Sequence, residues 1–305
     1  MSVHLKLLAL QSLRRIASEL GLSIDVPDFF SLYGSPPKEF EAALERVSSI
    51  LDYLMRNYGI TWWDVYLKSD IGAERVLLVK ELGLSREDVV LDVGCGRGYF
   101  SFAAAKVVKL VVGVDVMDYL GRVGWWGPFV EAVKSLGLEG KVLGVSADAT
   151  SLPLRDLSFD VAVMAHSVRD FVSIKALVRA VKEMKRVVKV GGYVVLIENL
   201  PTAKNKAQEN HLRLRSIRTK FIKNELRYLS KEELLRVVEE AGFKDIEIKV
   251  VNYGLCSTPA IFYLSKEHIK EGVDPSIIKE YEEVIKSIKE IGEESPPTAI
   301  IKAKK

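Results

Sequence analysis

The stretch VVLDVGCGRGYFS, residues 89–101, decides how the rest of the chain can fold. Its apolar start predicts a buried strand that reaches Asp92, and the apolar residues after the glycines predict the start of a helix. Between them, Gly94, Gly96 and Gly98 predict a tight turn, because glycine adopts positive φ and lets a ligand approach the backbone. The backbone N–H groups and the positive dipole end of a helix N-terminus suit electron-rich ligand groups.

The spacing of these glycines distinguishes between kinds of nucleotide site. Dinucleotide-binding folds carry G-x-G-x-x-G, whereas here the third glycine comes one residue early. An acid two residues before the first glycine, followed by G-x-G-x-G, resembles motif I of class I S-adenosylmethionine (SAM) methyltransferases. The resemblance implies that Arg97 and the turn backbone hold the methionine part of SAM, and the implied cofactor-binding residues are Asp92, Gly94, Gly96, Arg97 and Gly98. The alternative is a glycine-rich turn in another α/β protein.

Composition narrows the class of protein. The chain has 305 residues, of which 48% are hydrophobic and 28% charged, with a net charge of +3. These values are typical of a globular protein without global nucleic-acid or membrane character. Two cysteines cannot form a disulfide framework, and no signal peptide or apolar run long enough to span a bilayer is evident. We therefore expect a cytoplasmic protein, and the scarcity of glutamine hints at a thermophilic source.

The region before the glycine turn is expected to be entirely helical. Apolar periodicity predicts helices over residues 2–20, 36–57 and about 72–82, and no strand pattern precedes residue 88. In the resembled family such a region, here residues 1–85, forms a lid over the substrate. The alternatives are that it covers one edge of the sheet or forms a homodimer contact. An aromatic cluster near residues 62–66 either lines an apolar pocket or packs in the core.

The remaining chain predicts an α/β, Rossmann-like seven-stranded sheet of the class I methyltransferase type. Residues 86–305 would form this SAM-binding domain, with an insertion at about 201–229. After the first strand, further strands are predicted over residues 110–114, 142–146, 161–165, 193–197, 246–251 and 298–303. The resemblance implies that the last strand returns antiparallel between the fifth and the sixth, and residues 260–264 are the alternative for this strand. Helices are predicted over residues 173–188 and 231–241 and near 259–270 and 275–290.

Acids follow the predicted strands at one edge of the sheet, where open α/β folds bind ligands. Asp115 can accept both ribose hydroxyls of a nucleoside, and Met117 can pack on an adenine face. The resemblance implies that Asp148 and Ala149 receive the adenine amino group and that Val116 and Ala165 also line the cofactor site. Residues 148–154 resemble the small-molecule methyltransferases of ubiquinone and menaquinone biosynthesis, and the family likeness covers about residues 85–250.

The segment after the fourth strand lies beside the transferred methyl group in the resembled family. His166 is the best candidate for a general base, because its unperturbed pKa is near neutrality, and Asp170 is the second catalytic candidate. The alternative is that His166 only satisfies loop hydrogen bonds. Four scattered histidines suggest no zinc site and we expect no metal, although Asp170, Glu198 and Asn199 together would permit Mg²⁺.

The motifs of several methyltransferase subclasses are missing. The Asn/Asp-Pro-Pro-aromatic motif used on amide and base nitrogens is absent, and neither cysteine is placed as a cytosine-C5 nucleophile. These absences disfavour several subclasses, and the resemblance of residues 148–154 to small-molecule methyltransferases implies a small-molecule acceptor. The basic segment 204–227 is either a charged face packed over the core or a docking surface for an RNA or protein acceptor. A third alternative is a non-catalytic SAM-binding regulator.

Overall fold

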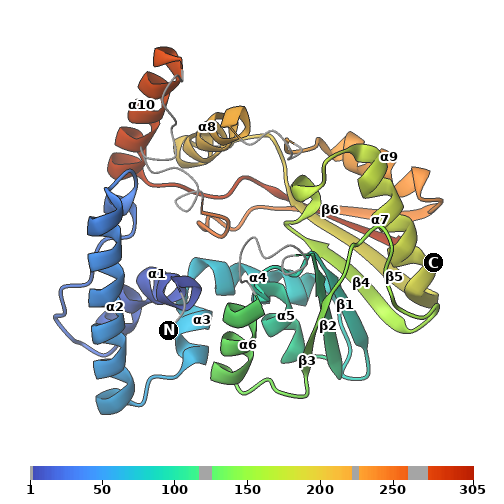
Figure 1. The fold of residues 1–305 in the computed structure, drawn as a ribbon, viewed down its shortest axis with the longest axis horizontal. Coiled ribbons are helices and arrows are strands. Elements are labelled where there is room, and N and C mark those ends of the chain that lie inside the picture. Colours follow the sequence, from blue (N-terminus) through green and yellow to red (C-terminus); the bar gives the residue numbers. More distant parts are fainter. Residues whose placement is uncertain (1–2, 117–125, 222–226, 260–273) are drawn as a thin grey trace. The chain divides into compact units, whose positions relative to one another are not determined.

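The computed structural model describes residues 3–116, 126–221, 227–259 and 274–305 (Figure 1). The chain divides into two compact units. Unit 1 comprises Met1–Glu74, Thr202–Lys223 and Tyr253–Pro296, and unit 2 comprises Arg75–Pro201, Asn224–Asn252 and Pro297–Lys305. Each unit therefore draws on three separate stretches of the sequence.

Unit 2 is built on one seven-stranded sheet with the order β3-β2-β1-β4-β5-β7-β6. All neighbours are parallel except β7, which runs antiparallel to both β5 and β6. The expected seven-stranded Rossmann-like sheet is confirmed, including the C-terminal placement of the returning strand. The strands are β1 (Val89–Val93), β2 (Leu110–Asp115), β3 (Val142–Ser146), β4 (Phe159–Ala165), β5 (Val188–Asn199), β6 (Asp245–Val251) and β7 (Thr298–Lys304).

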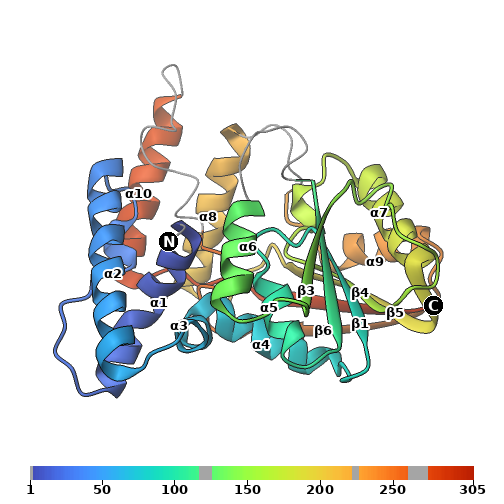
Figure 2. The ribbon, with the colours of Figure 1, turned by 60° about the horizontal axis from the view of Figure 1, so that its bottom comes forward.

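Helices cover both faces of this sheet. Figure 2 shows α7 (Ile174–Val187) and α9 (Lys231–Glu240) on one side, with α5 (Tyr99–Ala105) and α6 (Trp126–Ser135) on the other. The α7 helix begins at Ser173, whose side chain accepts a hydrogen bond from the backbone N–H of Ala176. It then buries Leu177, Val181 and Met184 against the core. The capping box at Ser230 and Glu233 starts α9 as its sequence predicts.

Unit 1 is helical over its described residues. Its N-terminal stretch forms α1 (Val3–Glu19), a short 3₁₀ turn η1 (Phe30–Leu32), α2 (Pro37–Tyr58) and α3 (Trp62–Lys68), and α4 (Asp70–Leu82) continues from it into unit 2. The later stretches supply α8 (Lys206–Phe221) and α10 (Pro275–Ile291), which pack on each other. The expected all-helical N-terminal region is confirmed.

Two sequence expectations in this unit have mixed outcomes. The helix near 275–290 is present as α10, whereas the helix expected near 259–270 and the alternative strand at 260–264 lie almost wholly outside the described residues. Of the aromatic cluster, Tyr66 is fully buried beside Trp63, with ring centroids 5.6 Å apart, while Trp62 and Trp63 are half-buried. Tyr66 is therefore a core residue of unit 1.

Candidate functional site

The glycine turn is tied to the end of β2. The backbone N–H groups of Gly94 and Cys95 both donate to the carbonyl of Val114, at 2.8 and 3.1 Å. Gly94, Gly96 and Gly98 have φ of +68°, +54° and +85°, a region that favours glycine. A Cβ at Gly94 would lie 2.5 Å from Ser167 Oγ, whereas one at Gly96 would meet no described atom within 4 Å. The space beside Gly94 is thus filled by Ser167, whereas the space beside Gly96 is open to a ligand.

The acid that ends β2 meets this open position. The Gly96 N–H donates to Oδ2 of Asp115 at 2.9 Å, and the Asp115 side chain is half-buried. The structure therefore brings together the glycine turn and the strand-end acid that the sequence assigns to one nucleoside site. Arg97 is half-buried in the same turn.

Asp92 supports the turn from the inside. Its buried carboxylate accepts a 2.6 Å hydrogen bond from Ser101 Oγ, in the first turns of α5. Burial raises the pKa of Asp92 to about 7, with nearby Asp115 adding to the effect and the Ser101 hydrogen bond opposing it. Its carboxylate is thus directed at α5, and direct contact with a cofactor stays a prediction.

The end of β3 carries an exposed acid in a tight local turn. Asp148 Oδ1 accepts hydrogen bonds from the backbone N–H and the hydroxyl of Thr150, at 2.7 and 2.8 Å. Such a turn holds the following backbone in place, and Ala149 is half-buried within it. Val116 is exposed after β2 and Ala165 half-buried at the end of β4, whereas Met117 lies outside the described residues.

A buried pair of side chains joins the ends of β4 and β5. His166 is 5% exposed and Glu198 is 0% exposed, and His166 Nδ1 lies 3.6 Å from Glu198 Oε1. The backbone of His166 has φ of +58°, which is unusual for a side chain of this size and is found at functional sites. Its N–H donates to the carbonyl of Ile197 at 2.8 Å, and this bond fixes the loop against β5.

The charges around this pair set its protonation. Burial lowers the pKa of His166 to about 4, and the positive charge of Arg75 adds to the effect. Burial alone would raise the pKa of Glu198, but Arg169, whose Nη1 lies 2.8 Å from Oε1, and His166 together lower it to about 2. At neutral pH the site therefore holds a neutral imidazole beside an ionised carboxylate. Glu198 opposes the lowering of the His166 pKa, because its carboxylate favours the protonated imidazole.

Asp170 is the second catalytic candidate from the sequence, whereas the acid found beside the His166 imidazole is Glu198. Asp170, predicted to be catalytic, is exposed, and its backbone N–H donates to Ser167 O at 3.1 Å. Glu198, considered from the sequence only as part of a metal-ligand set, is the acid beside the imidazole. The sequence signal for this role is that Glu198 is a charged residue directly after the apolar run of β5. Whether Asp170 takes part in catalysis stays a prediction.

Comparison with known proteins identifies the family. Residues 91–196 match the family model described as a methyltransferase domain. A demethylmenaquinone methyltransferase of Staphylococcus aureus (strain JH9) is 30% identical over 214 residues, which span 64% of this chain and 84% of that protein. The chain belongs to the class I SAM-dependent methyltransferases.

Solved structures agree with this assignment at the level of the fold. A cyclopropane-fatty-acyl-phospholipid synthase-like protein from Lactobacillus casei aligns with a TM-score of 0.60 and 18% identity, covering 77% of this methyltransferase and 91% of that chain. A geranyl diphosphate methyltransferase in complex with SAM aligns with a TM-score of 0.50 and 19% identity, covering 79% and 87%. The cofactor of the present enzyme is SAM, and its open turn at Gly96 beside a strand-end carboxylate fits a nucleoside.

Neither a metal site nor a membrane span is found in the described part of this methyltransferase. Among residues 3–116, 126–221, 227–259 and 274–305, no group of three or more His, Cys, Asp or Glu side chains is arranged to hold a metal ion. Over the same ranges, no helix has the length and apolar character needed to cross a bilayer.

Over its described residues, the basic segment 204–227 of the methyltransferase presents fewer cations to solvent than its sequence suggests. Arg215 and Arg218 of α8 are each only 7% exposed. Two of its other cations pair with acids of α10, because Arg213 Nη2 lies 3.4 Å from Glu283 and Lys220 Nζ lies 3.0 Å from Glu280. This arrangement favours the interpretation of α8 as a packed helix over that of a docking surface.

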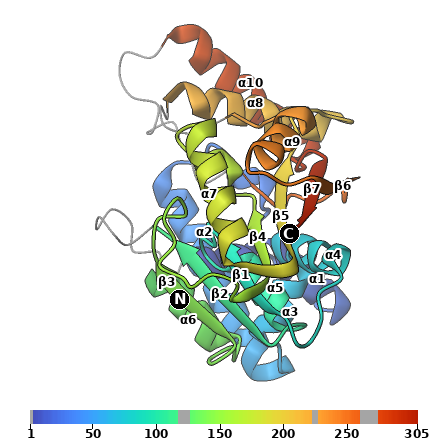
Figure 3. The same ribbon diagram turned by 90° about the vertical axis from the view of Figure 1, so that its right-hand side faces the viewer.

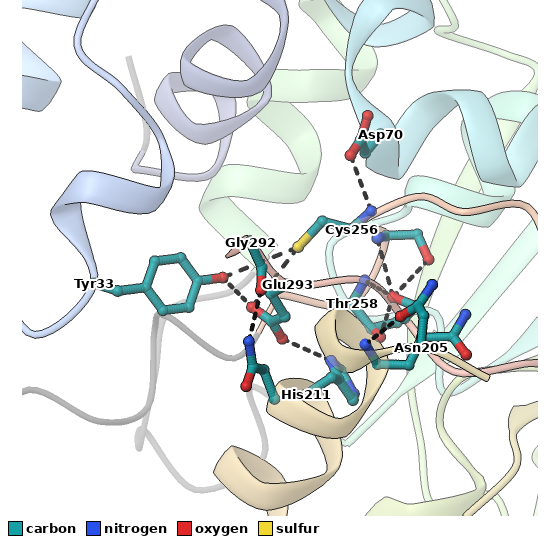
Figure 4. Close-up of polar contacts among 12 residues, drawn as sticks. Tyr33, Asp70, Asn205, His211, Cys256, Thr258, Gly292 and Glu293 are labelled. Atoms are coloured by element: carbon teal, nitrogen blue, oxygen red, sulfur yellow. Dashed lines mark hydrogen bonds and ion pairs between the residues drawn. The ribbon is translucent and has the colours of Figure 1, made fainter. Parts of the chain in front are cut away.

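A second buried polar cluster lies within unit 1 (Figure 4). Glu293 accepts a hydrogen bond from the Tyr33 hydroxyl, and its Oε1 lies 2.6 Å from Nδ1 of His211. The Cys256 thiol lies 3.7 Å from Glu293 Oε2, and burial raises the pKa of both Tyr33 and Cys256 well above their ordinary values. These residues come from the N-terminal loop, α8 and the segments after β6 and before β7, so the sequence carries no local signal for their meeting. The cluster joins the three stretches of unit 1.

Proposed function

We propose that this methyltransferase transfers the methyl group of SAM to a small-molecule acceptor, and that an aromatic ring with a removable proton is the acceptor class. The Staphylococcus aureus relative is named a demethylmenaquinone methyltransferase, and the likeness extends over 84% of that protein. The observation that carries the proposal is the position of the buried His166 imidazole at the end of β4, with its Nδ1 3.6 Å from the buried carboxylate of Glu198. A proton acceptor of this kind serves an acceptor atom that carries a proton before it is methylated.

In this proposal the residues around the glycine turn bind and align the cofactor. The backbone of residues 94–98, with Arg97, holds the methionine part, and Asp115 accepts the ribose hydroxyls. Asp148, Ala149 and Val116 surround the adenine, and Ala165 forms the wall next to the sulfonium. SAM supplies a methyl group that is already activated for in-line displacement, so alignment is the main contribution of the protein.

His166 is proposed to accept the proton that leaves the acceptor. Its pKa of about 4 keeps the imidazole neutral at pH 7, and Glu198, with Oε1 3.6 Å from Nδ1, stabilises the imidazolium once it forms. Arg169 is bound to the same carboxylate and sits 5.7 Å from the ring centroid of Tyr228, which limits its movement. Glu198 is therefore a positioning residue that acts through His166. Exposed Asp170 is proposed to contact the acceptor from the solvent side.

Residues 1–85 are proposed to act as a lid, and the connectivity of the chain supports this role. Unit 1 contains most of these residues, up to Glu74. Its two later stretches begin after β5, at Thr202, and after β6, at Tyr253. Both strands run parallel to β4, so these connections begin at the edge where ligands bind in open α/β folds.

The test is to incubate the enzyme with methyl-labelled SAM and an extract of its own source, and then to separate small molecules from acid-precipitated RNA and protein. Label in the small-molecule fraction, absent when His166→Asn enzyme is used, supports the proposal. Label in the precipitate indicates an RNA or protein acceptor and overturns it. A panel of purified hydroquinones and phenols then tests the acceptor class directly.

A further inference from the structure

The strand β6 forms one outer edge of the seven-stranded sheet. It is last in the strand order and pairs only with β7 among the described strands (Figure 3). One side of its backbone therefore carries peptide groups that no neighbouring described strand satisfies. Such an edge is a template for pairing with another strand unless its side chains prevent it.

The side chains of β6 are arranged symmetrically around Ile248. Ile246 and Val250 lie two residues to either side of it, and Glu247 and Lys249 lie one residue to either side. Since side chains alternate between faces, the three apolar residues share one face of the strand and the two charged residues share the other. Ile248 and Val250 remain 37% and 45% exposed, so this face of the edge strand offers apolar surface to a partner.

This pattern matches itself when two copies run antiparallel. In a two-fold pairing centred on Ile248, Glu247 lies opposite the partner's Lys249, and Lys249 lies opposite the partner's Glu247. Ile246 then faces the partner's Val250, so the apolar row continues across the junction. Opposite charges in directly facing positions stabilise an antiparallel pair, and a two-fold interface repeats each contact.

Neighbouring two-fold registers lack this match. A pairing centred on Glu247 places two carboxylates opposite each other, and one centred on Lys249 places two ammonium groups opposite each other. Lys249 also pairs with Glu81 of α4 in the same chain, and its side chain is 59% exposed and accessible to a second carboxylate. The charges of β6 therefore select one register.

We propose that two copies of this methyltransferase join through their β6 strands, antiparallel and centred on Ile248, so that the two sheets become continuous. The partner is a second copy because the charge order Glu247, Ile248, Lys249 is complementary to its own reverse. This inference concerns assembly and does not depend on the identity of the methyl acceptor.

The test uses Glu247→Lys and Lys249→Glu proteins, with mass measured by sedimentation and native mass spectrometry over a range of concentrations. Wild-type protein is expected to dimerise. Each variant faces itself with two like-charge pairs, so we expect its dimer to have a dissociation constant Kd about tenfold higher than that of wild type, or more. Mixing the two variants restores both opposite-charge pairs, and a heterodimer should form.

Controls separate this interface from misfolding and from other contacts. Glu139→Lys changes an exposed charge near the opposite edge of the sheet and should dimerise like wild type. The melting temperature and SAM affinity of each variant report on its fold, which matters for Lys249→Glu because it also loses the Glu81 pair. A monomeric wild-type protein overturns the proposal. So does a dimer that both variants retain, or the absence of heterodimer when folded variants are mixed.

Discussion

His166 Nδ1 lies 3.6 Å from Glu198 Oε1, with both side chains buried at the adjoining ends of β4 and β5. Arg169 holds the same carboxylate at 2.8 Å, so the acid stays ionised while the imidazole stays neutral. This combination supplies a proton acceptor together with an anion that stabilises its protonated form.

Replacing His166 by Asn should remove the proton acceptor while preserving the loop. Asn tolerates the left-handed conformation that His166 adopts at φ of +58°. We expect kcat for the natural acceptor to fall about 100-fold or more, with SAM affinity unchanged within about twofold. Val172→Ala, at an exposed position in the same loop, should retain wild-type kcat. A kcat near wild type in the Asn variant would show that no proton is taken up there.

Replacing Glu198 by Gln should destabilise the protein, because Arg169 then loses its buried anionic partner. We expect the free energy of unfolding at pH 7 to fall by about 3–5 kcal/mol. The pKa of Glu198 is lowered to about 2, so its carboxylate stabilises the fold above its unfolded pKa of about 4.5 and this contribution is lost as pH falls toward 2. Urea unfolding at pH 7 and pH 3 measures the difference, which should shrink at the lower pH. A constant difference would contradict the assignment.

Asp92 should have the opposite effect on the pH dependence of stability. Its pKa is raised to about 7, so the folded state binds a proton that the unfolded state has released, and stability declines as pH rises from about 4 to 7. We expect Asp92→Asn to flatten this decline, which amounts to on the order of 1 kcal/mol per unit of pKa shift. Ser101→Ala removes a hydrogen bond that lowers the pKa, so its decline should extend to higher pH. Unfolding curves of wild type and Asp92→Asn that stay parallel from pH 5 to 8 would contradict this.

Glu293 should be a main stabilising residue of unit 1. It is buried and bonded to Tyr33 and His211, so Glu293→Ala leaves two buried polar groups without their acceptor. We expect a loss of about 3–5 kcal/mol in the free energy of unfolding and faster hydrogen exchange in α8 and α10. Glu290→Gln, an exposed change nearby, is the matched control and should leave both unchanged. Wild-type exchange in the Ala variant would rule out this role for the cluster.

Structural features that are set by residues close together in the sequence could be predicted from the sequence. The glycine turn, the order of strands and the return of β7 between β5 and β6 follow from apolar periodicity, turn residues and one family motif. Contacts between side chains that are distant in the sequence could not be predicted in this way. His166 and Glu198 are 32 residues apart in the chain, and they meet only because β4 and β5 are neighbours in the sheet. The same holds for Glu293 and His211, and for the acids of α10 that pair with the cations of α8.

The affinity for SAM of wild-type enzyme and of Asp115→Ala, measured by calorimetry, tests the placement of the cofactor most directly. Asp115 accepts the Gly96 N–H at 2.9 Å, at the open position of the turn. Loss of a charged hydrogen-bonding group should weaken SAM binding by about tenfold or more, while Glu139→Lys retains wild-type affinity. Unchanged affinity in a folded Asp115→Ala protein would contradict the account, because the ribose would then lie elsewhere.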